Sequence, residues 1–195
     1  MSKGIVIGGS RGMGKAIASS LNSIGYDVIA TSKNELDTSD LKSVNDFVRT
    51  HKETDILVLN TGGPPVKEFS SVTEEEWKHF HNQLFLGFCM ILQKITINEG
   101  GYVFLISSSV IKEPSPRLVI SSAYRSAFAS VFKILSKSFA EKNISFINIA
   151  PGPINTDRTK ELIDNIEEYQ KTLPMKRLGE PKEIGDFVKA IVKIR

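Results

Sequence analysis

The stretch GIVIGGSRGMGKAIA, residues 4–18, constrains the fold of this chain more than any other part of its sequence. A short β-branched run precedes the glycines, and an amphipathic helical run follows them. A glycine-rich turn between a buried strand and a helix lets the backbone approach a pyrophosphate, whose charge is stabilised at the positive end of the helix. The turn therefore predicts a dinucleotide site. The contacts expected from it are Gly8, Ser10, Arg11, Gly12, Met13 and Gly14.

The rest of the chain alternates short β-branched runs with amphipathic helical runs, which is typical of a parallel sheet covered by helices. We therefore expect one α/β domain over residues 1–195, a Rossmann-type doubly wound parallel sheet of about six strands with helices on both faces. The expected strands lie within 4–8, 26–31, 55–63, 102–109 and 144–153, and the expected helices are 15–25, 40–51, 73–92, 121–141 and 182–194. No strand follows the last helix.

Composition excludes several classes of function. The net charge of +3 comes from scattered Lys and Arg residues, so we expect no nucleic-acid partner. The N-terminal apolar run is too short for a signal peptide or a membrane span, and we expect a cytoplasmic protein that binds no membrane. With one cysteine, and with His79 and His81 on different faces of a helix, we expect no metal site.

Three further motifs follow the glycine turn in order: NTGG at 60–63, NIAPGPINT at 148–156 and PMKRLGEPKEI at 174–184. Together with the glycine turn, they resemble the short-chain dehydrogenase/reductase family over nearly the whole chain, and within it the relatives of 3-oxoacyl carrier-protein reductases. The resemblance implies that the sheet lacks the last strand of that family and that residues 155–174 form a substrate lid. It also implies cofactor contacts at Asn60, Thr61, Gly62, Pro151, Gly152, Ile154 and Thr156.

The segment after the second expected strand bears on the choice of dinucleotide. An acid there would bind the ribose hydroxyls of NAD, whereas cations accept the extra phosphate of NADP. Ser32 and Lys33 stand at this position and Arg11 lies in the glycine turn, so we expect NADP(H), with NAD(H) as the alternative. Only three residues separate Lys33 from Asp37, so no helix is expected here. Asp37 resembles the family's aspartate near the adenine, but it could equally cap the next helix.

The catalytic positions depart from the family's pattern of Ser, Tyr and Lys with an Asn relay. Ser108 or Ser109 supplies the serine, and spacing does not separate them. Aligning the helix places Ser121 at the Tyr position and Arg125 at the Lys position. Leu84 falls at the Asn position, with Asn82 two residues away. A serine is too weak an acid to replace the tyrosine, and Arg125 stays charged, so it can bind an anion but cannot move a proton.

Tyr124 leaves two interpretations open: it packs against an adjacent helix, or it acts as a displaced proton donor. We expect an NADP(H)-dependent oxidoreductase that transfers hydride to or from a carbonyl or alcohol on a small substrate. Arg125 would hold the ribose or the oxyanion, and Tyr124 or a water would supply the proton. The alternative is a catalytically inactive protein that senses NADP(H) or acts through a partner. We also expect a homodimer through the helices near 73–92 and 121–141.

Overall fold

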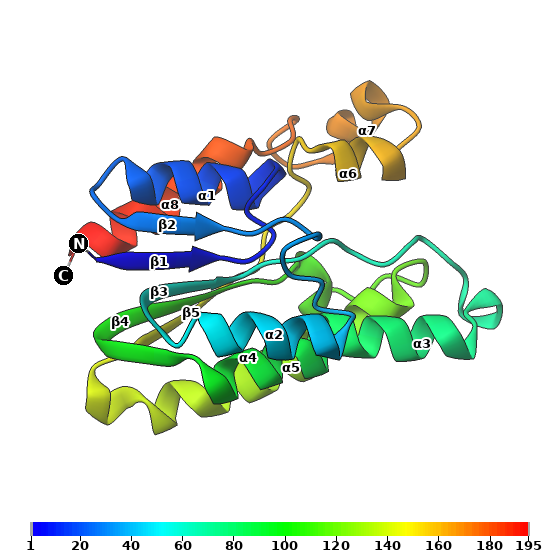
Figure 1. The fold of residues 1–195 in the computed structure, drawn as a ribbon. Helices are drawn as coiled ribbons and strands as arrows, with labels where there is room; N and C mark the ends of the chain where they lie inside the picture. Colours follow the sequence, from blue (N-terminus) through cyan, green and yellow to red (C-terminus); the bar gives the residue numbers. More distant parts are fainter. Residues whose placement is uncertain (1, 195) are drawn as a thin grey trace.

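A computed structural model describes residues 2–194, whose core is a five-stranded parallel sheet (Figure 1). The strands are β1 (Lys3–Val6), β2 (Asp27–Ala30), β3 (Glu53–Leu59), β4 (Thr96–Ile106) and β5 (Ser145–Ile149), in the spatial order β2-β1-β3-β4-β5. All four neighbouring pairs are parallel. The α/β Rossmann-type prediction is confirmed, although the described residues form five strands rather than about six.

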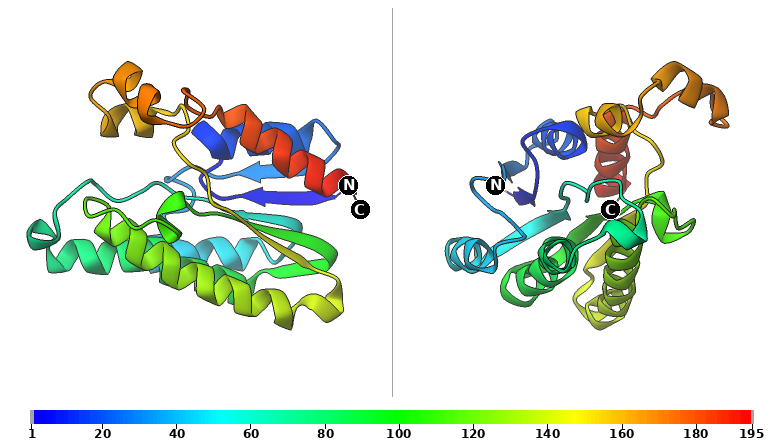
Figure 2. Two further views of the ribbon diagram at one scale, coloured as in Figure 1. Left: turned by 180° about the vertical axis from the view of Figure 1, so that it is seen from behind. Right: turned by 90° about the vertical axis from the view of Figure 1, so that its right-hand side faces the viewer.

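Helices cover both faces of the sheet (Figure 2). Helices α1 (Gly12–Asn22) and α8 (Pro181–Ile194) pack against each other on one face, where Ile17 and Val188 are buried against Val6 and Phe104 of the sheet. Helices α2 (Leu41–Thr50), α4 (Gly87–Lys94) and α5 (Val119–Ser138) cover the other face. Strands covered on both faces must be apolar throughout, which explains the uninterrupted apolar run of β3.

The helix expected over 73–92 begins where its sequence predicts and ends two residues later. Thr73 and Glu76 form the predicted capping box at the start of α3 (Glu74–His81). The helix then widens into a π-helix over Asn82–Leu86 before it continues as α4 to Lys94. A π-turn inserts one residue into the helical repeat and often marks a functional region.

Other boundaries differ from the sequence-based expectations. Helix α5 starts at Val119 and ends at Ser138, and a short 3-10 helix (Ala140–Lys142) follows it. Strand β4 starts at Thr96, before the turn expected at Gly100. The register shifts between the pairs Thr54–Ile97 and Ile56–Tyr102, which lets β4 pass Gly100 at a φ of 76°. Two other 3-10 helices span Phe69–Ser71 and Ser109–Ile111.

No helix forms between β2 and α2 in the described chain, as the short spacing predicts. The residue that caps α2 is Asp40, whose side chain accepts a hydrogen bond from the Lys42 amide. The interpretation of Asp37 as the cap of this helix is therefore wrong.

The expected lid leaves the sheet after β5 and contains two short helices, α6 (Asp157–Leu162) and α7 (Ile166–Thr172). Its base is closed by a parallel bridge between Ile154 and Gly179, with the Asn155 amide donating to the Gly179 carbonyl at 2.7 Å. Figure 1 shows α6 and α7 beyond the carboxyl ends of β1 and β2, where a lid over the glycine turn would lie. None of the described helices is both long and apolar enough to span a membrane.

Candidate functional site

The glycine turn joins β1 to α1 in the geometry that its sequence predicts. Gly12 has a φ of 53°, in the left-handed region that favours glycine, and it opens α1 directly after the extended Arg11. A Cβ on Gly14 would lie 2.1 Å from the Gly8 carbonyl oxygen, so only glycine allows the helix to approach the strand this closely. Asn60, at the end of β3, holds the turn by donating from Nδ2 to the Gly8 carbonyl at 3.1 Å.

Two glycines that follow β3 and β5 have open space beside them. A Cβ built on Gly62 or on Gly152 would meet no atom within 4 Å, whereas one on Gly12 would lie 3.5 Å from the Thr156 methyl group. These three parts of the chain lie along the carboxyl edge of the sheet, which is the ligand-binding groove of open α/β folds. This open space and the exposed N-terminus of α1 fit a bound dinucleotide.

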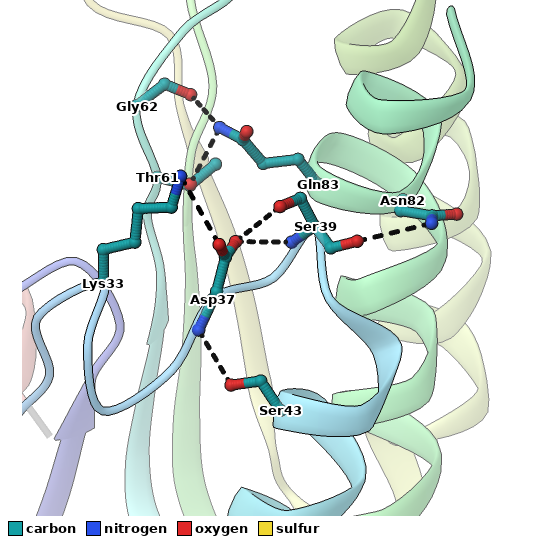
Figure 3. A network of polar contacts seen from close by, with 8 residues as sticks. All are labelled: Lys33, Asp37, Ser39, Ser43, Thr61, Gly62, Asn82 and Gln83. Atoms are coloured by element: carbon teal, nitrogen blue, oxygen red, sulfur yellow. Dashed lines mark hydrogen bonds and ion pairs between the residues drawn. The ribbon is translucent and has the colours of Figure 1, made fainter. Parts of the chain in front are cut away.

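Lys33 and Asp37 form the corner of this groove beside β2 (Figure 3). The Lys33 ammonium lies 3.4 Å from the Asp37 carboxylate. The same carboxylate accepts hydrogen bonds from the Ser39 hydroxyl and amide at 2.6 and 2.9 Å. Desolvation raises the pKa of Asp37, but the Ser39 hydrogen bonds and the charge of Lys33 outweigh it and lower the pKa overall. Lys33 is thus already paired with an acid in this corner.

The π-helix contributes two amide side chains that donate hydrogen bonds to the neighbouring loops. The sequence did not indicate these contacts. Gln83 donates from Nε2 to the Gly62 carbonyl at 2.8 Å and to the Thr61 hydroxyl at 3.2 Å (Figure 3). Asn82 donates to the Ser39 carbonyl at 3.3 Å. Leu84, at the position of the family's relay Asn, is buried. The π-helix therefore positions the loops that border the groove.

Arg125 lies buried under the carboxyl end of β4. Its Nε donates to the Ser121 hydroxyl at 3.2 Å, and its Nη1 donates to the carbonyls of Ile106 and Ser107 at 3.2 and 3.4 Å. Ser121 and Arg125, which stand one helical turn apart, are therefore bonded to each other. Burial lowers the pKa of Arg125 to about 10, so the guanidinium stays charged at neutral pH. Its Nη2 makes no hydrogen bond to another described residue, which leaves one donor for a ligand.

Tyr124 has a partner outside the groove. Its hydroxyl donates to the Trp77 carbonyl at 3.1 Å, and its ring packs edge-on against the rings of Trp77 and His81. Burial raises the pKa of Tyr124 above its ordinary value, which makes the phenol a weaker acid. Of the two interpretations of Tyr124, this geometry favours packing against the neighbouring helix over a role as proton donor.

The two candidate serines differ in exposure. Ser108 is half-buried directly after β4, and its hydroxyl accepts only a long bond of 3.4 Å from the Val110 amide. Ser109 is exposed, and its amide donates to the Pro151 carbonyl at 3.0 Å. The preceding Ser107 is buried and bonds to Asn148 at 2.6 Å, which joins β4 to β5. The hydroxyls of Ser108 and Ser109 both lack a short hydrogen bond to another described residue, so both serines stay candidates.

The expected lid reaches the loop after β3 through Arg158. Arg158 of α6 donates from Nη2 to the Pro64 carbonyl, beyond the NTGG segment, and its Nη1 lies 3.3 Å from Glu161. The sequence did not single out Arg158, because its position in the lid alone does not indicate which loop it reaches.

Comparison with known proteins identifies the family of this chain. A family model described as enoyl-(acyl carrier protein) reductase matches residues 35–193. The chain belongs to the short-chain dehydrogenase/reductase family. A relative of this family, the 3-oxoacyl-[acyl-carrier-protein] reductase FabG of Chlamydia trachomatis, is 29% identical over 167 residues, which cover 83% of this chain. The chain spans 66% of that relative's length, just under two thirds.

Solved structures of short-chain dehydrogenases/reductases share the fold. One from Burkholderia cenocepacia in complex with NADP aligns with a TM-score of 0.87 at 20% identity, covering 98% of this chain and 90% of its own. The 3-oxoacyl-[acyl-carrier protein] reductase of Brucella melitensis in complex with NAD aligns with a TM-score of 0.86 at 20% identity, covering 98% of this chain and 89% of its own. The Rossmann-type assignment is thus confirmed independently of the motifs.

Proposed function

We propose that this chain is an oxidoreductase that transfers a hydride between NADP(H) and a carbonyl or alcohol group on a small, mostly apolar substrate. The observation that carries the proposal is the glycine turn at the carboxyl edge of the sheet, beside which Gly62 and Gly152 leave open space after β3 and β5. When bound there, the nicotinamide ring supplies or accepts the hydride. The family of this chain and the complexes of its structural neighbours with NADP and NAD support the assignment.

Three groups of the chain have the chemistry for the remaining tasks. Ser108 or Ser109 polarises the substrate carbonyl through its hydroxyl. Arg125 holds the ribose or the developing oxyanion through its unused Nη2, since a guanidinium stabilises negative charge without having to lose its proton. The proton comes from an ordered water rather than from Tyr124, because the Tyr124 hydroxyl is engaged with the Trp77 carbonyl.

A second candidate function is a protein that binds NADP(H) but reduces nothing, as a sensor or through a partner. The geometry of Tyr124 favours this alternative, because it leaves the described groove without a tyrosine that could give a proton. The near-complete set of cofactor motifs and the unused donor on Arg125 favour the reductase. A carbonyl-reduction assay in the presence of NADPH distinguishes the two.

The first test of the proposal is cofactor binding by the parent protein. We expect NADPH to bind about tenfold tighter than NADH, because Arg11 and Lys33 can pair with the 2′-phosphate. One charge-assisted hydrogen bond contributes roughly 1.5–3 kcal/mol, and the exposure of both cations places the preference at the low end. Isothermal titration calorimetry with each cofactor measures it. Equal affinities would contradict the NADP(H) assignment, and binding of neither would contradict the whole proposal.

A further inference from the structure

Strand β5 forms one edge of the sheet, and some of its backbone groups face away from β4. It is the last strand in the order β2-β1-β3-β4-β5, and in the view from behind no helix lies over it (Figure 2). The Ile149 carbonyl accepts from the Ser107 amide at 2.8 Å, so the backbone of Ile149 faces β4. Successive residues of a strand turn their N–H and C=O groups to opposite sides, so those of Phe146 and Asn148 face outward.

A hollow of about 410 Å³ lies beside this edge of the sheet. Phe146 and Asn148, the residues with outward backbone groups, line one side of it, and Ala129 and Phe132 of α5 line the other. The rings of Phe132 and Phe146 pack together with their centroids 4.9 Å apart, which gives the hollow an apolar floor. An extended chain that lay along β5 would therefore meet both unpaired backbone groups and an apolar surface.

The charged side chains that line the hollow are both cations. Lys112 follows the short helix after β4, and Lys133 lies on α5. Both side chains are exposed, and neither forms an ion pair with another described residue. By contrast, Lys42 and Lys78 pair with acids of their own helices. No carboxylate of the described chain lines the hollow, so its charge is complementary to an acidic occupant.

A second copy of this chain does not fit the same edge. A twofold axis along β5 would place Lys112 and Lys133 of one copy beside the same cations of the other, and like charges across a strand pair are destabilising.

We propose that β5 binds an extended, acidic segment of a partner protein as an added strand. The backbone of the segment pairs with the outward groups of Phe146 and Asn148. Its apolar side chains contact the Phe132 and Phe146 rings, and its acids pair with Lys112 and Lys133. The main chain supplies affinity, and the two cations select for charge.

The first test uses the parent protein and a synthetic peptide. The peptide has about seven residues, in which glutamate, valine and glutamate alternate with threonine, and at about 3.3 Å per residue it spans β5. Its sequence reads the same in both directions, so it can pair parallel or antiparallel. At about ten times its dissociation constant, we expect hydrogen exchange of the Phe146 and Asn148 amides to slow about tenfold. The Ile147 amide, which faces β4, should change little. ¹⁵N-edited NMR measures all three.

A charge exchange tests the choice of an acidic partner. Lys133→Glu should weaken binding of the peptide about fivefold, because one exposed attraction becomes a repulsion. The same variant should tighten binding of a peptide with lysine in place of glutamate. Lys52→Glu is the matched control, since Lys52 is exposed, forms no ion pair with a described residue and lies before β3. It should leave both affinities within about twofold of the parent.

The opposite edge of the sheet serves as an internal control. The hollow beside β2 is lined by Glu35, Asp40 and Asp46, so the outward Ala30 amide should not respond to the acidic peptide. If millimolar peptide leaves the exchange of Phe146 and Asn148 unchanged, the proposal is overturned, and the two cations only guard the edge against pairing between copies. Equal binding of the glutamate and lysine peptides would overturn the acidic partner. These tests need no dinucleotide, so their outcome is independent of the proposed function.

Discussion

Tyr124 and Arg125 are neighbours in the sequence, yet the fold gives their side chains different partners. Arg125 reaches under β4 to the carbonyls of Ile106 and Ser107, while Tyr124 donates to Trp77 of α3. Adjacent residues on a helix are about 100° apart, so they need not share a face. Of the two side chains, the one buried under β4 is therefore Arg125, which stays charged at neutral pH.

Tyr124→Phe tests whether the tyrosine hydroxyl takes part in chemistry. We expect turnover and NADPH affinity to stay within about threefold of the parent, because the removed hydroxyl bonds only to Trp77 in the described structure. The free energy of unfolding should fall by about 1 kcal/mol, the contribution of a neutral hydrogen bond. Steady-state kinetics and urea denaturation measure the two effects. A loss of turnover by ~10²–10⁴, typical of removing a general acid, would show instead that Tyr124 donates the proton.

For single residues, the sequence predicted which side chains lie one helical turn apart, but not which partner each side chain points toward. The distance between Ser121 and Arg125 indicated that they share one turn, and the structure confirms a bond between them. The hydrogen bond from the Ser32 amide to the Glu35 carboxylate was not predicted, because the same four residues also fit a solvated loop. The partner of Tyr124 was left open for a related reason: the sequence does not give the distance between two helices.

At the scale of the elements, an ion pair between Arg177 and Glu183 joins the end of the expected lid to the start of α8. Arg177 lies 2.6 Å from the Glu183 carboxylate, which also accepts a hydrogen bond from the Glu180 amide. The Arg177 hydrogen bond, and then the Glu180 amide, lower the pKa of Glu183 from 4.5 to about 2. The carboxylate thus closes the first turn of α8 and fixes the end of the lid beside the Ile154–Gly179 bridge.

Glu183 should contribute to stability at neutral pH and lose its contribution in acid. Because its pKa is lower in the folded chain, its stabilisation is fully present above pH ~4.5 and is lost as the pH falls towards 2. Urea midpoints of the parent should therefore fall more steeply over this range than those of Glu183→Gln. The matched control is Glu113→Gln, since Glu113 is exposed and its carboxylate has no partner among the described residues. Parallel curves for parent and Glu183→Gln would contradict the role of this clamp.

Boundaries set by local cap chemistry were easier to predict from the sequence than boundaries set by pairing between elements. The Thr73–Glu76 capping box marks the start of α3 because cap chemistry is local. The π-helix at Asn82–Leu86 inserts one residue without a sequence signal, since the apolar pattern over 73–92 fits a regular helix as well. The early start of β4 depends on its pairing with β3, which local sequence does not encode.

At the scale of the whole molecule, the sheet brings the glycine turn, the NTGG segment and the end of β5 to one edge, although they are far apart in the sequence (Figure 1). Because parallel strands end at the same edge of the sheet, motifs that follow different strands meet there. Short motifs in the sequence could therefore indicate a dinucleotide site at this edge. The homodimer through the helices near 73–92 and 121–141 stays a prediction. So does the role of residues 155–174 as a substrate lid, which the Arg158 contact with Pro64 supports.

Hydride transfer itself is the central claim, and isotope transfer tests it most directly. The parent protein is incubated with NADPH carrying deuterium at either face of the nicotinamide C4 and with a panel of aldehydes, diketones and 3-oxoacyl thioesters. We expect mass spectrometry to find deuterium on the new carbinol carbon of at least one product, from one of the two labelled cofactors only. A protein that binds NADPH in the groove yet gives no labelled alcohol across the panel would contradict the reductase and establish the binding protein in its place.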